Sequence, residues 1–200
     1  MEQISYYASV AGFVRVIALW FVFGGVFIFR KKLEATKDGA KAPKSYIGLA
    51  LQGAGFGSVW AMRRTPMFSS FIEGQYVLNL VLQVFAAALA AVSVWLAMSA
   101  IKELGKQWSL QARLVEGHKL ITSGVYASVR HPIYTAMLGM LVAIGVAYSH
   151  SLATLVGIVI FIIGTKIRTA SEERLLGDAF GEKFADWKAK VPGLIPFIGF

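Results

Sequence analysis

The chain has 200 residues, of which 56% are hydrophobic and only 16% are charged, and its formal net charge is +9. Soluble domains average about 45–50% apolar and about 25% charged residues, so the composition indicates an integral membrane protein, in agreement with a mean hydropathy of +0.62. The lack of cysteine excludes disulfides, thiolate metal sites and cysteine nucleophiles. The positive charge accompanies no nucleic-acid-binding motif, so a nucleic-acid partner is not expected.

Three apolar runs in the first half predict three transmembrane helices, at about residues 7–29, 45–62 and 76–101. Only Arg15, to which we assign no role, interrupts the first run. Glu2 stands where a signal peptide would be basic, so no cleavable signal is expected. Residues 1–101 therefore read as an N-terminal unit of three transmembrane helices.

The second unit, residues 102–200, starts with a polar loop and continues with two shorter apolar runs. These runs, at residues 133–148 and 151–167, are separated by so few residues that they predict a transmembrane helical hairpin over 133–167. Beyond the hairpin, apolar residues recur at helical spacing, at Phe180, Phe184, Trp187 and Val191. This pattern predicts an amphipathic C-terminal helix at the membrane surface, with its apolar side on the bilayer or on the helical bundle.

The distribution of basic residues predicts the orientation in the membrane. Segments 30–44, 102–130 and 166–200 contain six, five and six Lys or Arg, which is 17 of the 20 in the chain. Such loops remain cytoplasmic, so we expect a multi-pass protein of a prokaryotic inner membrane with its N-terminus outside and its C-terminus in the cytoplasm. Arg63 and Arg64 oppose this orientation, because they fall in an outer loop. The fold predicted is all-α, with about five transmembrane helices and a cofactor pocket at the cytoplasmic face.

Two polar stretches border these apolar runs and are the candidates for chemistry. In the first, His118 to Tyr134, Pro132 suits the first turn of a helix. The unpaired N–H groups at that helix start could bind the carboxylate or hydroxyls of a ligand. We expect His118, Tyr126, His131 and Tyr134 to cluster near it. The alternative is a structural belt, since Tyr and His are common at headgroup depth.

In the second stretch, Arg168 and Glu172 are four residues apart and share one helical face. They form either an ordinary intrahelical ion pair or a site in which Arg168 holds an anionic substrate and Glu172 holds a cationic or hydroxyl-bearing part of a cofactor. The histidines lack the spacing of known metal motifs, so no metal is expected. Glycine-rich nucleotide-binding motifs are also absent from the sequence.

From about Lys102 onward the sequence resembles the isoprenylcysteine carboxyl methyltransferase family, whose wider group includes membrane phospholipid methyltransferases. The resemblance rests on Leu104-Gly105, His118-x-Leu120-x-Thr122-Ser123-Gly124-x-Tyr126, Arg130-His131-Pro132-x-Tyr134, Arg168, Glu172-Glu173, Phe180-Gly181 and Val191-Pro192…Pro196-Phe197. The chain departs from the family in having fewer helices before this region than eukaryotic members. It also has Tyr134-Thr135-Ala136 where the family often has glycine as the third residue.

The resemblance implies S-adenosylmethionine as the cofactor and methylation at the cytosolic membrane face. It implies Arg168 as the substrate-binding residue and Arg168 and Glu172 as the catalytic ones. It also implies cofactor contacts at Gln111, His118, Lys119, Leu120, Ile121, Tyr126, His131, Pro132, Ile133, Tyr134 and Glu172.

The function expected is carboxyl O-methylation of an isoprenylcysteine-like lipophilic carboxylate. A carboxylate is ionised at pH 7, so no general base is needed. If the acceptor were a phospholipid amine, Glu172 or Glu173 could take its proton. A third reading is an NADPH-dependent reductase, because sterol reductases share a similar Arg-His-Pro-x-Tyr run, and a fourth is a scaffold without a cofactor. The partners expected are membrane lipids and a lipophilic or lipidated substrate from the bilayer, with no obligate protein partner.

Overall fold

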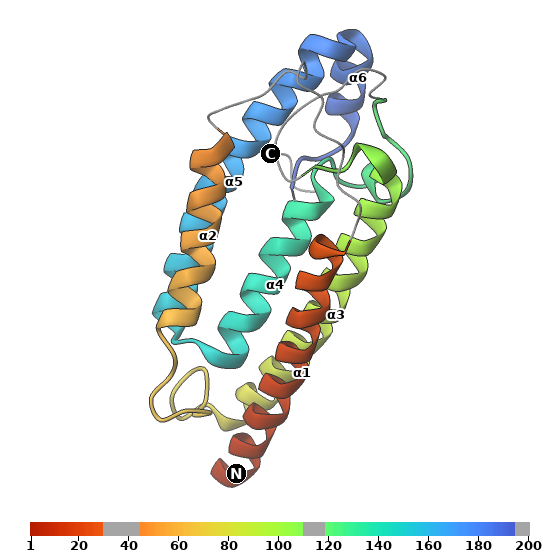
Figure 1. The fold of residues 1–200 in the computed structure, drawn as a ribbon. Coiled ribbons are helices and arrows are strands. Elements are labelled where there is room, and N and C mark those ends of the chain that lie inside the picture. Colours follow the sequence, from red (N-terminus) through yellow and green to blue (C-terminus); the bar gives the residue numbers. More distant parts are fainter. Residues whose placement is uncertain (30–44, 110–118, 195–200) are drawn as a thin grey trace.

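The protein is an all-helical bundle, as the sequence predicts (Figure 1). The computed structural model describes residues 1–29, 45–109 and 119–194. The α-helices are α1 (Glu2–Ile28), α2 (Ser45–Ala61), α3 (Tyr76–Leu104), α4 (Pro132–Tyr148), α5 (Ser151–Phe180) and α6 (Glu182–Lys190). Two short 3₁₀ turns, Gly105–Gln107 and Gly124–Ala127, follow α3 and precede α4.

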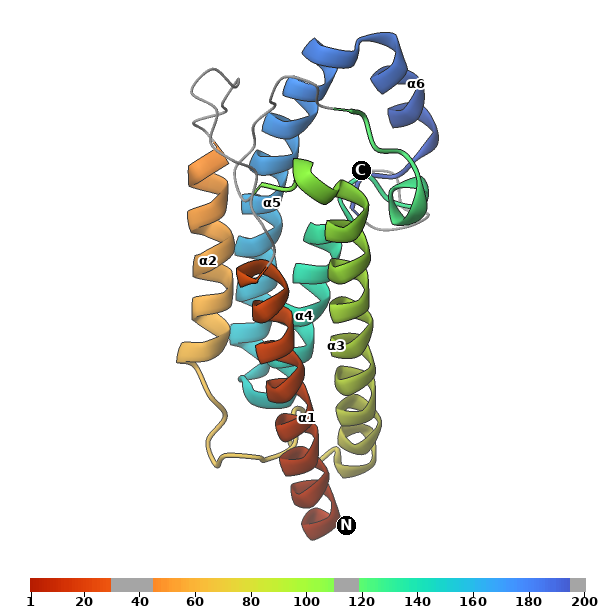
Figure 2. The same cartoon turned by 45° about the vertical axis from the view of Figure 1, so that its right-hand side comes forward.

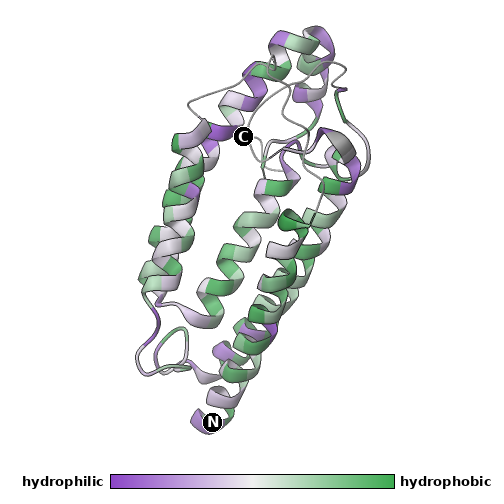
Figure 3. Ribbon diagram, viewed as in Figure 1, coloured by the Kyte–Doolittle hydropathy of each residue, from purple (hydrophilic) through white to green (hydrophobic). Residues whose placement is uncertain are grey.

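Three of the described helices, α1, α3 and α5, are long and apolar enough to cross a membrane, and α4 is a shorter apolar helix of 17 residues. Figure 3 shows apolar residues along the whole bundle and a concentration of polar residues at the end where α5 meets α6. The N-terminus lies at the opposite end of the bundle (Figures 1 and 2).

The helix α4 occupies the centre of the bundle. It packs against α1, α2, α3 and α5, and Figure 2 shows it between the pair formed by α2 and α5 and the pair formed by α1 and α3. Ten of its residues are buried, which explains why its sequence is apolar on all sides. Because α4 begins at Pro132, its position fixes the preceding Arg130 and His131 against the rest of the protein.

Glycines bring α2 and α5 into backbone contact. A Cβ atom on Gly48 would lie 2.5 Å from the carbonyl oxygen of Gly164, and one on Gly55 would lie 2.7 Å from that of Gly157. These two pairs allow the close approach that small residues give to membrane helices. The aliphatic part of the Arg168 side chain packs at the same place, because a Cβ atom on Gly48 would also lie 2.6 Å from Cγ of Arg168.

Helix α5 extends further than the hairpin predicted from the sequence. It continues for more than three turns beyond residue 167 and ends at Gly181, which has φ 52°. The polar segment that follows the apolar run is rich in Glu, Leu and Ala, which favour helix. Consequently Arg168, Glu172 and Glu173 stand on a rigid extension of an apolar helix instead of on a loop.

Arg64, which opposes the predicted orientation, has a structural role. Its side chain is buried, and its Nη2 donates to the carbonyl oxygens of Val146 at 3.0 Å and Ala147 at 2.7 Å. Its backbone N–H bonds to the carbonyl oxygen of Tyr148 at 3.2 Å. A cation at this position satisfies the terminal carbonyls of α4 and complements the helix dipole.

The predicted amphipathic C-terminal helix is interrupted at Gly181, so that Phe180 ends α5 and the shorter α6 follows. The apolar side of α6 packs on the protein: Phe184 and Trp187 form one cluster with Ala100 and Tyr126. Beyond α6, the carbonyl oxygens of Pro192 and Gly193 accept the backbone N–H groups of Arg130 and His131, at 2.8 and 2.9 Å. The end of the described chain therefore lies directly against the start of α4.

Candidate active site

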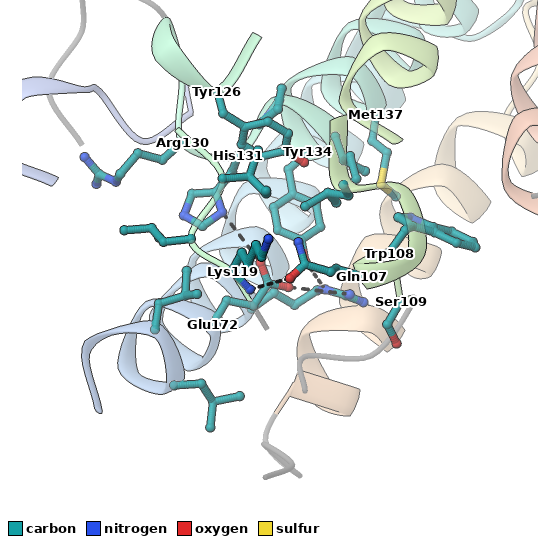
Figure 4. Close-up of a pocket in the computed structure, with 18 of the residues that line it drawn as sticks. Gln107, Trp108, Ser109, Lys119, Tyr126, Arg130, His131, Tyr134, Met137 and Glu172 are labelled. Carbon is teal, nitrogen blue, oxygen red and sulfur yellow. Dashed lines mark hydrogen bonds and ion pairs between the residues drawn. The ribbon is translucent and has the colours of Figure 1, made fainter. Parts of the chain in front are cut away.

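A pocket forms at the polar end of the bundle, where the end of α3, the segment before α4, the start of α4, the polar part of α5 and α6 meet (Figure 4). Ten of the twelve predicted site residues line it: Lys119, Leu120, Ile121, Tyr126, His131, Pro132, Ile133, Tyr134, Arg168 and Glu172. The other two, Gln111 and His118, lie outside the described residues. The fold therefore brings these ten predicted residues together from three separate segments of the chain.

Arg168, Tyr134 and Glu172 form the cluster in the wall of the pocket. Arg168 is only 4% exposed, and its Nε donates to the hydroxyl of Tyr134 at 2.9 Å, with its guanidinium 5.2 Å from the centre of that ring. The Tyr134 hydroxyl donates in turn to Oε1 of Glu172. The distance from Nη2 of Arg168 to the same carboxylate oxygen is 3.9 Å, so Tyr134 provides a closer link between Arg168 and Glu172 than the direct ion pair does.

His131 joins this cluster to a second carboxylate. Its Nδ1 lies 3.6 Å from Oε2 of Glu172, and its Nε2 lies 3.1 Å from Oε1 of Glu173. Glu173 is also paired with Arg130, Nε to Oε1 at 3.0 Å, and with Lys188, Nζ to Oε2 at 2.7 Å. The two carboxylates therefore differ: Glu172 faces the pocket, whereas Glu173 neutralises the basic residues behind it.

The environment shifts the pKa of two residues that precede α4. Burial lowers the pKa of His131, but hydrogen bonds and charge from Glu172 and Glu173 outweigh burial, so the net pKa lies above the ordinary value. Burial, with Glu172 and Glu103 nearby, raises the pKa of Tyr126. Tyr126 therefore remains a neutral phenol at physiological pH, and the imidazole of His131 is biased toward its charged form.

The start of α4 is less open to a ligand than the sequence predicts. The N–H of His131 bonds to Gly193, and the N–H groups of Tyr134 and Thr135 both bond to the carbonyl oxygen of His131. Three of the donors expected to hold an anionic ligand are thus already used within the protein. Side chains, above all Arg168 and His131, provide the positive charge of the pocket instead.

Several residues of this pocket were not predicted from the sequence. Gln107 and Trp108, which follow α3, line it, and Oε1 of Gln107 accepts the backbone N–H of Lys119. Trp187 also lines it, and its buried Nε1 has no acceptor within the described part of the chain. The amphipathic pattern of α6 could have identified Trp187, because a buried indole N–H usually needs a partner. No signal in the sequence singles out Gln107.

The pocket has a polar and an apolar part. Glu172, His131 and Lys119 are charged or chargeable, whereas Phe27 of α1, Leu49 of α2 and Met137 of α4 extend the lining into the bundle. About 170 Å³ of free space remains between these walls, less than the roughly 300 Å³ at the small end of ligand sites. A ligand of nucleoside size is therefore larger than the free space between these walls.

Within residues 1–29, 45–109 and 119–194, no three His, Cys, Asp or Glu side chains are grouped in a way that could hold a metal ion.

Comparison with known proteins identifies the family. The profile of the phospholipid methyltransferase family matches residues 81–183, about half of the chain and most of the pocket. The chain belongs to this family. It is 28% identical over 149 residues to the protein-S-isoprenylcysteine O-methyltransferase of Schizosaccharomyces pombe, a match that covers 73% of this chain and 61% of the yeast protein.

Two further relatives carry the same name. The chain is 30% identical over 120 residues to the enzyme of Rattus norvegicus, covering 60% of this chain and 40% of the rat protein. It is 30% identical over 89 residues to a form from Arabidopsis thaliana, covering 44% and 45% of the two chains. The resemblance to the isoprenylcysteine carboxyl methyltransferase group is therefore confirmed. The chain spans about half the length of these relatives, from 40% to 61%.

Proposed function

We propose that this protein is a membrane-bound, S-adenosylmethionine-dependent methyltransferase that O-methylates an isoprenylcysteine-like lipophilic carboxylate. The observation that carries the proposal is the buried guanidinium of Arg168, held by Tyr134 between the polar and apolar parts of the pocket. A buried cation there favours an anionic acceptor with a hydrophobic tail. The three isoprenylcysteine O-methyltransferases among the relatives support the same acceptor class.

The residues of the polar part fit the proposed cofactor. Glu172 presents a carboxylate that suits the cationic or hydroxyl-bearing parts of S-adenosylmethionine. The N–H of Trp187, which has no acceptor among the described residues, offers a donor in a buried setting, as an aromatic heterocycle with ring acceptors requires. Leu120, Ile121 and Leu176 supply an apolar wall beside it. When bound, the cofactor would supply a methyl group activated by its sulfonium.

The proposed role of the protein in the reaction is positioning and removal of water. Arg168 aligns the acceptor carboxylate, and Tyr134 holds the guanidinium through its ring and its hydroxyl. Attack of an anion on a cation neutralises both charges. A dry pocket therefore destabilises the separated ions more than the transition state, and this difference lowers the barrier. The carboxylate carries no proton to remove, which agrees with the absence of a catalytic triad from the described pocket.

The proposal includes the arrangement in the membrane. Helices α1 to α5 would all cross it, with α2 and α4, at 17 residues each, spanning about 25 Å of a hydrocarbon core of about 30 Å. The pocket would face the cytoplasm, with the N-terminus outside. The soluble cofactor would then arrive from the cytoplasm, while the lipophilic acceptor would reach the apolar part from the bilayer.

A phospholipid amine is the second candidate acceptor, because the matching family carries that name. An amine must lose a proton, and Glu172, with His131 3.6 Å away and Glu173 beyond it, offers a route for that proton. Arg168 disfavours a cationic headgroup beside it unless it binds the lipid phosphate.

Calorimetry and label transfer test the proposal. Purified protein should release heat of binding with S-adenosylhomocysteine and not with NADPH. Heat with NADPH alone would indicate a reductase. Heat with neither ligand would indicate a scaffold. Radiolabelled methyl from S-adenosylmethionine should then pass to an S-prenylated N-acylcysteine and not to its carboxamide. Transfer to phosphatidylethanolamine instead would establish the amine acceptor.

A further inference from the structure

A second cavity lies behind the candidate active site, on the other side of His131 and Arg130, which line both cavities. It has about 330 Å³ of free space, within the range of ligand sites, and opens between α5 and the segment that follows α6. Its other lining residues are Ile162, Thr165, Lys166, Thr169, Ala170, Glu173, Lys188, Gly193 and Leu194. The reaction proposed above uses none of the residues found only in this cavity, apart from the support that Glu173 gives to His131.

The wall formed by α5 changes from apolar to polar along the helix. Ile162, Lys166, Thr169 and Glu173 succeed one another at spacings of three or four residues and therefore share a helical face. The apolar end, at Ile162, adjoins exposed hydrophobic residues of α5 such as Val159 and Ile163, while the polar end reaches Lys188 of α6. The cavity thus crosses the level at which α5 leaves its apolar run.

The charge at the polar end is positive. Arg130, Lys166 and Lys188 line the cavity together with one carboxylate, that of Glu173. Glu173 lies 2.7 Å from Nζ of Lys188 and 3.0 Å from Nε of Arg130. Lys166 and Lys188 are both exposed, so the described rim of the opening is basic.

We propose that this cavity binds an anionic membrane phospholipid, with the phosphate between Lys166 and Lys188 and an acyl chain along Ile162 and Leu194. An apolar floor below a basic rim at the membrane boundary matches a lipid with a charged headgroup and a hydrophobic tail. This lipid would be a resident ligand distinct from the methyl acceptor, because the cavity lies on the side of His131 away from Arg168 and the pocket.

The test is titration of the purified protein with dioleoyl phosphatidylglycerol in detergent, followed by native mass spectrometry, with dioleoyl phosphatidylcholine as the neutral comparison. Phosphatidylglycerol should bind the wild-type protein more tightly than phosphatidylcholine. Lys166→Gln should weaken the binding of phosphatidylglycerol by about fivefold, as expected for one lost cation near a membrane surface. Ala170→Phe, which fills the cavity without changing charge, should weaken the binding of both lipids. Lys183→Gln, on the exposed side of α6 and outside the cavity, should have no effect.

Equal loss of affinity in Lys166→Gln and Lys183→Gln would overturn the proposal, because it would reduce the effect to general surface charge. So would displacement of phosphatidylglycerol by glycerol phosphate at equal concentration, which would indicate a free-phosphate site. Transfer of radiolabelled methyl from S-adenosylmethionine to phosphatidylglycerol would also overturn it, by making the lipid an acceptor. Binding of S-adenosylhomocysteine, measured on the same variants, should remain at the wild-type level.

Discussion

Arg168 combines deep burial with a carboxylate neighbour at 3.9 Å, a separation too long for a direct hydrogen bond. Arg168→Ala should lower kcat/KM for the proposed carboxylate acceptor by about a hundredfold, the effect of losing charge-assisted bonds worth about 3 kcal/mol. Arg168→Lys should recover only part of that loss, because an ammonium cannot form the paired contacts of a guanidinium. Steady-state label transfer measures all three proteins.

Arg174→Ala is the matched control for Arg168, since it removes an exposed arginine from the same helix outside the pocket. It should leave kcat/KM within about twofold of the wild type, as is usual for surface substitutions. A similar small effect in both variants would remove Arg168 from its proposed role. Calorimetry with S-adenosylhomocysteine separates the proposed substrate role of Arg168 from the proposed cofactor role of Glu172. Glu172→Gln should weaken the binding of S-adenosylhomocysteine more than Arg168→Ala does.

His131 makes stability depend on pH. Its pKa in the folded protein lies above the ordinary value because Glu172 and Glu173 outweigh burial. The stabilisation is therefore complete below the unfolded pKa of about 6.5 and is lost as pH rises through the folded value. The difference in Tm between wild type and His131→Gln should therefore shrink as pH rises above about 6.5. A difference that stays constant as pH rises would mean that His131 does not change charge; Arg130 and Lys188 also face Glu173.

At the scale of elements, contact between α2 and α5 depends on glycine. Gly48→Ala would place its methyl group against Gly164 and Arg168, and overpacking of this kind costs about 1–3 kcal/mol. It should lower Tm and also weaken acceptor turnover, because the stem of Arg168 must move. Gly53→Ala, in the same helix but facing open space, should leave Tm unchanged or raise it slightly through better helix propensity. Equal effects of the two substitutions would contradict the packing argument.

The helices themselves were predictable from the sequence because their apolar runs are long. The exception was the end of α5. Hydropathy locates the boundary of the apolar run near residue 167 but cannot tell whether the helix ends there, and the structure continues it to Gly181. The break between α5 and α6 depends on a backbone φ of 52° at Gly181. Phe180, Phe184 and Trp187 keep a helical spacing across that break, so the sequence pattern predicted one continuous helix.

At the scale of the whole molecule, the orientation in the membrane can be measured directly, because the chain has no cysteine. Glu2→Cys and Lys190→Cys place single thiols on exposed residues at opposite ends of the bundle. In intact cells a membrane-impermeant maleimide should label the first and not the second, and inverted vesicles should give the reverse. Labelling of Lys190→Cys in intact cells would place the pocket on the outer side.

The grouping of the site was predictable because the predicted hairpin returns the chain to the same membrane face. That reasoning brought Arg168 and Glu172 to His131 and Tyr134. The contributions of Phe27, Leu49 and Gln52 were not predictable, because α1 and α2 carry no motif and only three-dimensional packing places them in the lining. Arg64 shows the same limit: its role depends on the terminal carbonyls of a helix more than eighty residues away.

The backbone bonds from Arg130 and His131 to Pro192 and Gly193 have a consequence for biosynthesis. The ribosome makes the two acceptor residues only after the six described α-helices have been synthesised. The transmembrane helices can therefore insert and associate while the start of α4 still lacks its final partners. Assembly of the pocket becomes a late event, so the nascent protein should bind the proposed cofactor after, and not during, membrane insertion.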